Sequence, residues 1–176
     1  DLLKNKSLVN KIAENSITLV DGFGRSRVAF KLLGLIGKIY LKPASKEDSL
    51  LIYNWFVDPK IRSNSLVSKT ITFNDHNDWF QKQLISELCL IYILTDEFNT
   101  PLGNIRLEKS VNNKEVKISY CLDFIARGIG ISFKLVQLGI SEAQKQWGGK
   151  LIFKGTIKDS NIPSIKTFIK LGFQKI

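Results

Sequence analysis

The chain has 176 residues, enough for one domain with a substantial core and too few for two complete enzymatic domains. Its content of 44% hydrophobic and 24% charged residues is ordinary for a globular protein, and no apolar run approaches the roughly 20 residues that span a bilayer, which excludes a membrane-spanning protein. The formal net charge of +10 favours polyanionic ligands, but no long block of like charges occurs, so we expect a phosphate-rich small molecule rather than nucleic acid.

The start of the chain and its cysteines set further limits. Residues 1–6 show no secretory signal, so we expect a cytoplasmic protein. The sequence contains no methionine, even at position 1, which predicts a fragment or a processed chain. Cys89 and Cys121 lie far apart and form no C-x-x-C pair, so neither a metal site nor a disulfide framework is predicted. Both are expected to be buried, unreactive thiols.

Residues 1–36 form a leading segment that is too short for a domain of its own. An apolar scatter with helical spacing over 2–12 is followed by a glycine-rich turn at 21–24. A new pattern, with the spacing of a strand, starts at residue 38. We therefore place a boundary near residue 36 and one main domain over 37–176.

The main domain is expected to open with a strand over 38–42 and a helix. Ser45 can act as the N-cap of this helix, and Asp48 can complete a capping box. The helix is expected to end just before Pro59, because the residue before a proline disfavours the helical conformation. The polar stretch 62–69 is then expected to be a loop that leads into a second helix and that can line a site.

The rest of the domain is expected to combine a meander of strands with two helices. In the strand at 115–122 apolar and polar residues alternate, so one face is core and the other can border a cleft. Together the elements predict an α/β (α+β) fold with a mixed, mainly antiparallel sheet and helices on both faces. The expected elements are strands at 88–95, 102–109, 115–122 and 150–157 and helices at 130–147 and 162–171.

The segment Arg-Gly-Ile-Gly-Ile-Ser at 127–132 joins a strand to a helix and is the clearest chemical motif. Its glycines allow a tight turn, and unpaired amides at the positive end of a helix dipole favour an anion. The third glycine of a dinucleotide-binding fingerprint is missing, and no Gly-Lys-Ser/Thr of a P-loop follows. The turn therefore predicts a phosphate site of another kind.

Two signatures, in this order, resemble the GNAT acetyltransferase superfamily. Arg127 and Gly130 match its coenzyme motif Gln/Arg-x-x-Gly-x-Gly/Ala, with Ser132 in the last, small-residue place. Further along, Asn161 precedes a helix that ends in Gly-Phe, as in the second signature of that superfamily. The resemblance covers residues 38–176 and implies a GNAT-like fold that binds the pyrophosphate of acetyl-CoA on the glycine turn.

The resemblance also implies direct attack of an amine on the thioester. In the superfamily a bulge splays one strand from its neighbour, and a backbone N–H there polarises the thioester carbonyl. Where many members have a tyrosine that protonates the leaving thiolate, this chain has Phe168. The coenzyme-binding residues that the resemblance implies are Ile118, Tyr120, Leu122, Arg127, Gly128, Ile129, Gly130, Ile131, Ser132, Asn161, Ser164 and Phe168.

Three residues are candidates for catalytic side chains. Glu108 and Asp123 stand at strand ends that border the expected cleft and can act as general base, although a carboxylate in such a place is more often only solvated. Tyr120, on the strand that is expected to splay, completes the set. His76 is the sole histidine, and its place in the first turn of a helix, one turn before Trp79, favours a positioning role over catalysis.

Looser motifs indicate the acceptor. The stretch 58–65 and the His76-x-x-Trp79 element resemble the GNAT branch that acetylates UDP-linked 4-amino-4,6-dideoxy sugars in pseudaminic-type acid biosynthesis. Residues 15–28 resemble the C-terminal end of UDP-sugar hydrolases of that pathway, some of which are fused to such a transferase. The resemblance implies Arg62, His76 and Trp79 as acceptor-binding residues, with Arg62 pairing with the diphosphate.

Two alternatives stay open. A ribosomal-protein or protein N-terminal acetyltransferase shares the helix-loop-helix opening and the H-x-x-W-like element, and it would acetylate a peptide amine. A non-catalytic module that binds acyl-CoA or nucleic acid would fit Phe168 and the net charge. Turnover of acetyl-CoA separates this module from both enzymes.

Overall fold

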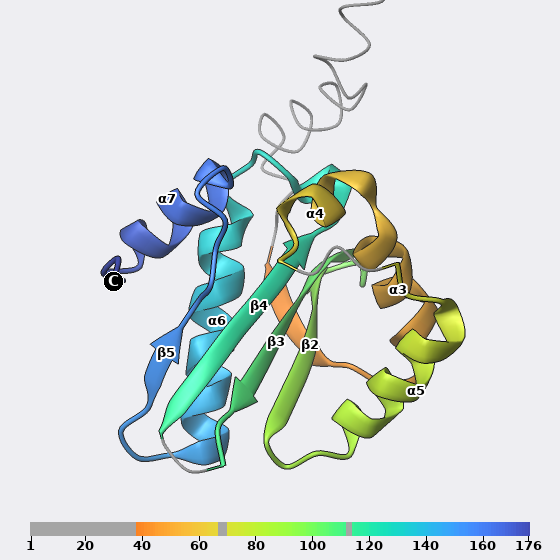
Figure 1. Ribbon diagram of the computed structural model, residues 1–176, viewed down its shortest axis with the longest axis horizontal. Coiled ribbons are helices and arrows are strands. Elements are labelled where there is room, and N and C mark those ends of the chain that lie inside the picture. The colour runs from red at the N-terminus through yellow and green to blue at the C-terminus, as the bar shows by residue number, and fades with distance from the viewer. Residues whose placement is uncertain (1–37, 67–69, 112–113) are drawn as a thin grey trace, which may run out of the picture. The chain divides into compact units, whose positions relative to one another are not determined.

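The computed structural model describes residues 38–66, 70–111 and 114–176. These residues form a five-stranded sheet in the order β1-β2-β3-β4-β5, with helices on both faces (Figure 1). Strands β1 to β4 pair antiparallel, and β5 lies parallel to β4. The expected mixed, mainly antiparallel sheet is thus confirmed. The predicted leader at 1–36 lies outside the described residues.

The elements follow one another in nearly the order that the sequence predicted. The strands are β1 Ile39–Pro43, β2 Cys89–Asp96, β3 Pro101–Lys109, β4 Glu115–Leu122 and β5 Ile152–Lys154. The helices are α3 Ser49–Val57, α4 Pro59–Asn64, α5 Phe73–Leu84, α6 Ile131–Trp147 and α7 Ile162–Lys170, with single 3-10 turns η2 at Lys46–Asp48 and η3 at Phe124–Ala126. None of the helices in the described ranges is long and apolar enough to cross a membrane.

Helices α3 and α5 cover one face of the sheet. The predicted capping box forms before α3, where Asp48 Oδ2 accepts from the backbone N–H of Ser45 at 2.8 Å and from its hydroxyl at 2.9 Å. Thr72 caps α5 by accepting from the amide of Asp75 at 3.2 Å. Each large side chain buried beneath these helices stabilises the fold by roughly 1.5–3 kcal/mol. The buried cluster on this face is Ile52, Trp55, Phe80, Cys89, Ile91 and Ile93.

Helix α6 covers the opposite face and approaches it closely. A methyl group at Gly139 would collide with the side chain of Ile105 on β3, so only glycine lets the helix lie this near the strand. Leu135, Val136 and Ala143 of α6 are fully buried. The N-terminus of α6 is thereby fixed at the end of the sheet where β4 ends.

One predicted loop is a helix. The sequence predicted that the polar stretch from residue 62 is irregular, but α4 runs from Pro59 to Asn64 and carries Arg62. Asp58 caps α4, since its Oδ1 accepts from the amides of Lys60 at 2.8 Å and Ile61 at 3.0 Å. Proline suits the first helical position because the missing N–H would have no partner there. Residues 67–69 lie outside the described ranges.

Two predictions about strands were also wrong in part. The strand predicted at 150–157 is only Ile152–Lys154, because it leaves the sheet after pairing with the first residues of β4. The more polar face of β4 does not border a cleft along its whole length. At Cys121 this face packs against the cluster under α3 and α5, so it is part of a second core.

Candidate active site

Strands β4 and β5 part from each other after three paired residues. They pair only from Glu115↔Ile152 to Lys117↔Lys154, whereas β4 stays paired with β3 as far as Leu122. Residues 118–122, which we call the open edge of β4, are therefore flanked on one side only by a strand in the described structure. The β3–β4 register runs without a shift, so the strands part without the β4 bulge that the resemblance implied; the register shift of the sheet lies at Leu94/Thr95 in β2.

The hydrogen bonds between β3 and β4 determine which backbone groups face the open edge. The amide of Asp123 donates to the carbonyl of Leu102 on β3 at 2.9 Å. Along an antiparallel ladder, residues directed to the partner alternate with residues directed away from it. Asp123 is thus directed to β3. Leu122 and Tyr120 lie one and three residues before it, so their N–H and C=O groups point to the open edge.

The glycine turn lies beside the end of this edge (Figure 1). Gly128 and Gly130 both adopt the left-handed conformation, with φ of 78° and 82°. No side chain caps α6, and the first-turn amides of a helix have no intrahelical partner. A Cβ atom on Gly130 would meet nothing within 4 Å, so the space in front of the turn is open. The turn can therefore bond an anion through its backbone.

The side chain of Arg127 does not point into this open space. Its Nε donates to the carbonyl of Leu122 at 3.0 Å, and its Nη2 lies 3.1 Å from Asp58 Oδ2. The guanidinium thus ties the turn to the end of β4 and to the beginning of α4. Any contact of this segment with a ligand would come from backbone amides, while the arginine side chain shapes the turn.

Helix α7 contributes hydroxyl groups to the same region. Asn161 caps this helix by accepting from the amide of Ser164 at 3.3 Å, and the Ser164 hydroxyl lies 3.1 Å from that of Tyr120. Ser132 on α6 hydrogen-bonds Thr167 at 2.9 Å. Phe168 is buried, with its ring centroid 6.2 Å from that of Tyr120. The predicted coenzyme residues of β4, α6 and α7 are thus brought together.

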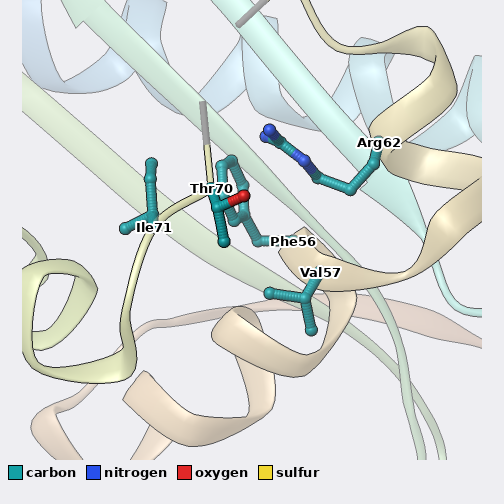
Figure 2. A pocket seen from close by; sticks show the side chains of 5 residues that line it. All are labelled: Phe56, Val57, Arg62, Thr70 and Ile71. Atoms are coloured by element: carbon teal, nitrogen blue, oxygen red, sulfur yellow. The ribbon is translucent and has the colours of Figure 1, made fainter. Parts of the chain in front are cut away.

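A pocket of about 220 Å³ opens between α3 and α4, and Figure 2 shows the side chains that line it. The guanidinium of Arg62 reaches over the ring of Phe56, 4.7 Å from its centroid, and Val57, Thr70 and Ile71 complete the lining. A cation beside an aromatic ring and a hydroxyl can bind an anionic group. The sequence singled out Arg62, but not Phe56 or Thr70, because their distance in the chain hides that they meet.

A stack of rings connects Arg62 with the other predicted acceptor residues. Phe56 lies on His76 with centroids 6.2 Å apart, and His76 contacts Trp79 at 5.6 Å. The guanidinium of Arg106 lies 4.8 Å from the centroid of Trp79. Arg62, His76 and Trp79 are therefore brought together, but His76 and Trp79 form a layer behind the pocket rather than its lining.

No model of a known family matches the chain, and no curated protein matches it. A domain from Methanocaldococcus jannaschii is 26% identical, covers 79% of this chain and 90% of its own, and has a TM-score of 0.68. A spermidine N-acetyltransferase from Vibrio cholerae, solved with CoA and spermine, is 14% identical over 78% of this chain and 82% of its own, with a TM-score of 0.71. AAC(6')-Ib, solved with paromomycin and acetyl-CoA, is 17% identical over 80% and 85%, with a TM-score of 0.65.

The chain has the GNAT fold. Its sheet, with a mainly antiparallel part and a parallel last strand, matches these acetyltransferase structures over about four fifths of the chain.

The fold places the two candidate carboxylates apart. Asp123 lies at the open edge, but Trp55 Nε1 donates to its Oδ2 at 2.7 Å and the amide of Ile125 donates to its Oδ1 at 3.0 Å. Glu108 pairs with Arg106 at 3.1 Å. It lies five residues along β3 from Gly103, the partner of Leu122, which corresponds to about 17 Å. Asp123 is thus close to the site and engaged by other groups, whereas Glu108 lies at the other end of the strands.

Cys89 and Cys121 are poor nucleophiles. Burial raises the pKa of Cys89 to about 11 and that of Cys121 to about 12. The thiol of Cys121 donates to Asn104 Oδ1 at 2.7 Å. Both thiols therefore stay protonated near neutral pH, in line with the sequence prediction. Within the described ranges no three His, Cys, Asp or Glu side chains form a group that can hold a metal ion.

His76 is buried among aromatic rings and is neutral at pH 7. Only 4% of its surface is exposed, and besides Phe56 and Trp79 it contacts Tyr53 at 5.4 Å and Phe80 at 5.9 Å. Burial, and to a lesser extent the positive charge of Arg106, lowers its pKa below the usual value. A buried ring that is already neutral supports a positioning role.

We expect the stability of the domain to fall as the pH is lowered from 7.5 to 5.5. The unfolded chain protonates its histidine near pH 6.5, whereas folded His76 resists the proton, so acid favours the unfolded state within this interval. His76 is the sole histidine, so in His76→Gln the decrease should largely disappear. Urea unfolding at both pH values measures the effect. An equal decrease in both proteins would contradict this assignment.

Proposed function

We propose that this chain is an N-acetyltransferase that uses acetyl-CoA to acetylate a primary amine. The observation that carries the proposal is the open edge of β4, which ends directly beside the uncapped N-terminus of α6. The extended pantetheine arm of the coenzyme carries amide groups that can bond the strand edge, while its pyrophosphate bonds the helix amides. The structures solved with CoA or acetyl-CoA that share the fold support this use of the site.

The residues present fit such a coenzyme. The amides of residues 128–132 would hold the pyrophosphate, and Gly130 leaves room for it because no atom lies within 4 Å of its missing Cβ. The backbone groups of Tyr120 and the amide of Leu122 would hold the pantetheine arm, while the Leu122 carbonyl accepts from Arg127 Nε. Acetyl-CoA supplies the acetyl group as a thioester. An N–H at the open edge of β4 would stabilise the negative charge that grows on the carbonyl oxygen.

The proton balance points to Tyr120. As the C–N bond forms and the C–S bond breaks, the amine loses a proton and the thiolate gains one. Phe168 has no proton to donate to the thiolate. Tyr120 lies beside Phe168, with ring centroids 6.2 Å apart, and its hydroxyl lies 3.1 Å from that of Ser164. We assign Tyr120 as the proton donor and leave the amine proton to solvent or to Asp123, which borders the edge.

The acceptor that the pocket supports best is a UDP-linked 4-amino-4,6-dideoxy sugar, as in pseudaminic-type acid biosynthesis. The guanidinium of Arg62 in the pocket would pair with the diphosphate and would repel a second ammonium group, which disfavours polyamines. The hydrolase-like residues 15–28 support the same pathway. In this proposal residues 37–176 are the transferase domain, residues 1–36 are the end of a hydrolase that is fused to it or associated with it, and the reaction takes place in the cytoplasm.

An acceptor screen that follows thiol release from acetyl-CoA tests the proposal. We expect turnover with UDP-4-amino-4,6-dideoxy sugars and at least about 100-fold less with spermidine, paromomycin or N-terminal peptides, because these acceptors bring no diphosphate to form charge-assisted hydrogen bonds with Arg62. Gly130→Glu protein, purified in the same way, controls for contaminating transferases. Turnover of peptides alone would favour the protein acetyltransferase, and no turnover of any amine would favour a non-catalytic module.

A further inference from the structure

Helix α4 is attached to both sides of the proposed coenzyme site. At its beginning, Asp58 Oδ2 pairs with Arg127 at 3.1 Å, just before the glycine turn. At its end, Lys158 Nζ donates to the carbonyl of Ser63 at 2.9 Å. Lys158 comes from the segment between β5 and α7, on the far side of the parted strands. The helix thus connects the α6 side of the site with the β5 side.

These end contacts matter because α4 is short and its other contacts are few: Ile61 packs against the cluster beneath α3 and α5, and Arg62 lies over the ring of Phe56. The helix has six residues and none of them is buried. A helix of this length is not stable by itself, so its position depends on its caps and tertiary contacts. Burial alone would raise the pKa of Asp58, but hydrogen bonds from Arg127 and from the amides of Ile61 and Lys60 outweigh it and keep the pKa below its usual value. The carboxylate is therefore charged when it holds both Arg127 and α4.

The same helix carries Arg62 into the acceptor pocket. Arg62 lies one turn after Asp58, and its amide donates to the carbonyl of Asp58 at 2.8 Å. A shift of the glycine turn would move Arg127, then Asp58, and with them the guanidinium above Phe56. One continuous set of polar contacts therefore leads from the coenzyme turn to the acceptor pocket.

We propose that Asp58 and Arg127 are positioning residues that couple the two sites, so that a coenzyme on the glycine turn orders α4 and sets Arg62 for the acceptor. Because binding free energies are linked reciprocally, the acceptor must then tighten coenzyme binding by the same factor. The proposal rests on the coenzyme site proposed above. It adds a coupling between the two sites and names the side chains that carry it.

Hydrogen–deuterium exchange with coenzyme A as the only ligand tests the coupling without an acceptor. In the wild-type protein we expect saturating CoA to slow exchange of the amides of residues 128–133, and to slow those of residues 60–65 by at least about 10-fold, since order at the turn is passed to α4. In Asp58→Asn, which can still cap the helix, the turn should keep its protection while the effect on α4 falls below about 2-fold.

Lys158→Ala provides a second variant that leaves the turn and its arginine untouched, and it should also reduce the protection of α4 by CoA. Lys175→Ala, which removes an exposed ion pair with Asp159, is the matched control and should behave like the wild type. Protection of the turn without protection of α4, or protection of α4 that survives in Asp58→Asn and Lys158→Ala, would overturn the coupling alone. Protection of neither segment would overturn the coenzyme site, and the coupling with it.

Discussion

Replacing Gly130 by glutamate is expected to weaken acetyl-CoA binding at least about 100-fold and to leave the domain folded. A Cβ atom at this position meets no protein atom within 4 Å, so the new side chain starts in the open space that we assign to the pyrophosphate. There it blocks the amides and adds a negative charge opposite the phosphates, which reverses the electrostatics of the turn. The left-handed φ of 82° costs a non-glycine residue about 1–2 kcal/mol of stability, less than a domain of this size can lose.

Isothermal titration calorimetry measures this loss, and Gly148→Glu is the matched control. Gly148 also has a positive φ, of 58°, and no atom within 4 Å of its missing Cβ, but its ψ of −170° lies in a region that essentially only glycine adopts. It caps the other end of the 17-residue α6, about 25 Å from the turn. The control should bind acetyl-CoA like the wild type, although it loses at least as much stability as Gly130→Glu. If Gly130→Glu also retains wild-type affinity, the coenzyme does not bind at this turn.

Arg62→Ala is expected to raise the KM for a UDP-linked amino sugar about 10- to 100-fold, with kcat and the KM for acetyl-CoA changed by less than about 3-fold. Hydrogen bonds between a guanidinium and a diphosphate are charge-assisted and contribute about 1.5–3 kcal/mol. Loss of the contact between Arg62 and Phe56 lowers the free energy of unfolding by only about 0.5–1 kcal/mol, so the variant should stay folded. Steady-state kinetics with each substrate varied in turn separates the two KM values.

Lys60→Ala distinguishes a direct contact from a general effect of charge. Lys60 lies on the same helix as Arg62, and Lys60→Ala removes the same positive charge. Lys60 is, however, exposed and does not line the pocket. We expect its KM for the sugar to change less than about 3-fold, because exposed charges are screened at physiological salt. Equal effects of the two variants would mean that Arg62 acts only through long-range attraction, and the diphosphate would then have to bind elsewhere.

The sequence was sufficient for features that depend on a few neighbouring residues. Ser45 and Asp48 predicted the capping box, because its two hydrogen bonds join residues three apart. The alternation of strands β2 to β4 predicted the meander, since short turns make consecutive strands pair antiparallel. The glycines at 128 and 130 predicted a tight turn before a helix, and both adopt a positive φ that only glycine adopts freely. A proline after Asp58 could also have predicted α4, as the cap and first position of a helix.

The tertiary structure alone decided how these local elements form a site. Nothing near Arg127 in the sequence indicates that its guanidinium pairs with Asp58 instead of facing a ligand, because that choice depends on where α4 packs. The ring stack from Phe56 to Trp79 forms only when α3 and α5 lie on the same face of the sheet. The parting of β4 and β5 depends on a parallel pairing between strands that are separated by the whole of α6. Such contacts join distant segments, and their geometry follows from the packing of the entire domain rather than from local conformational preference.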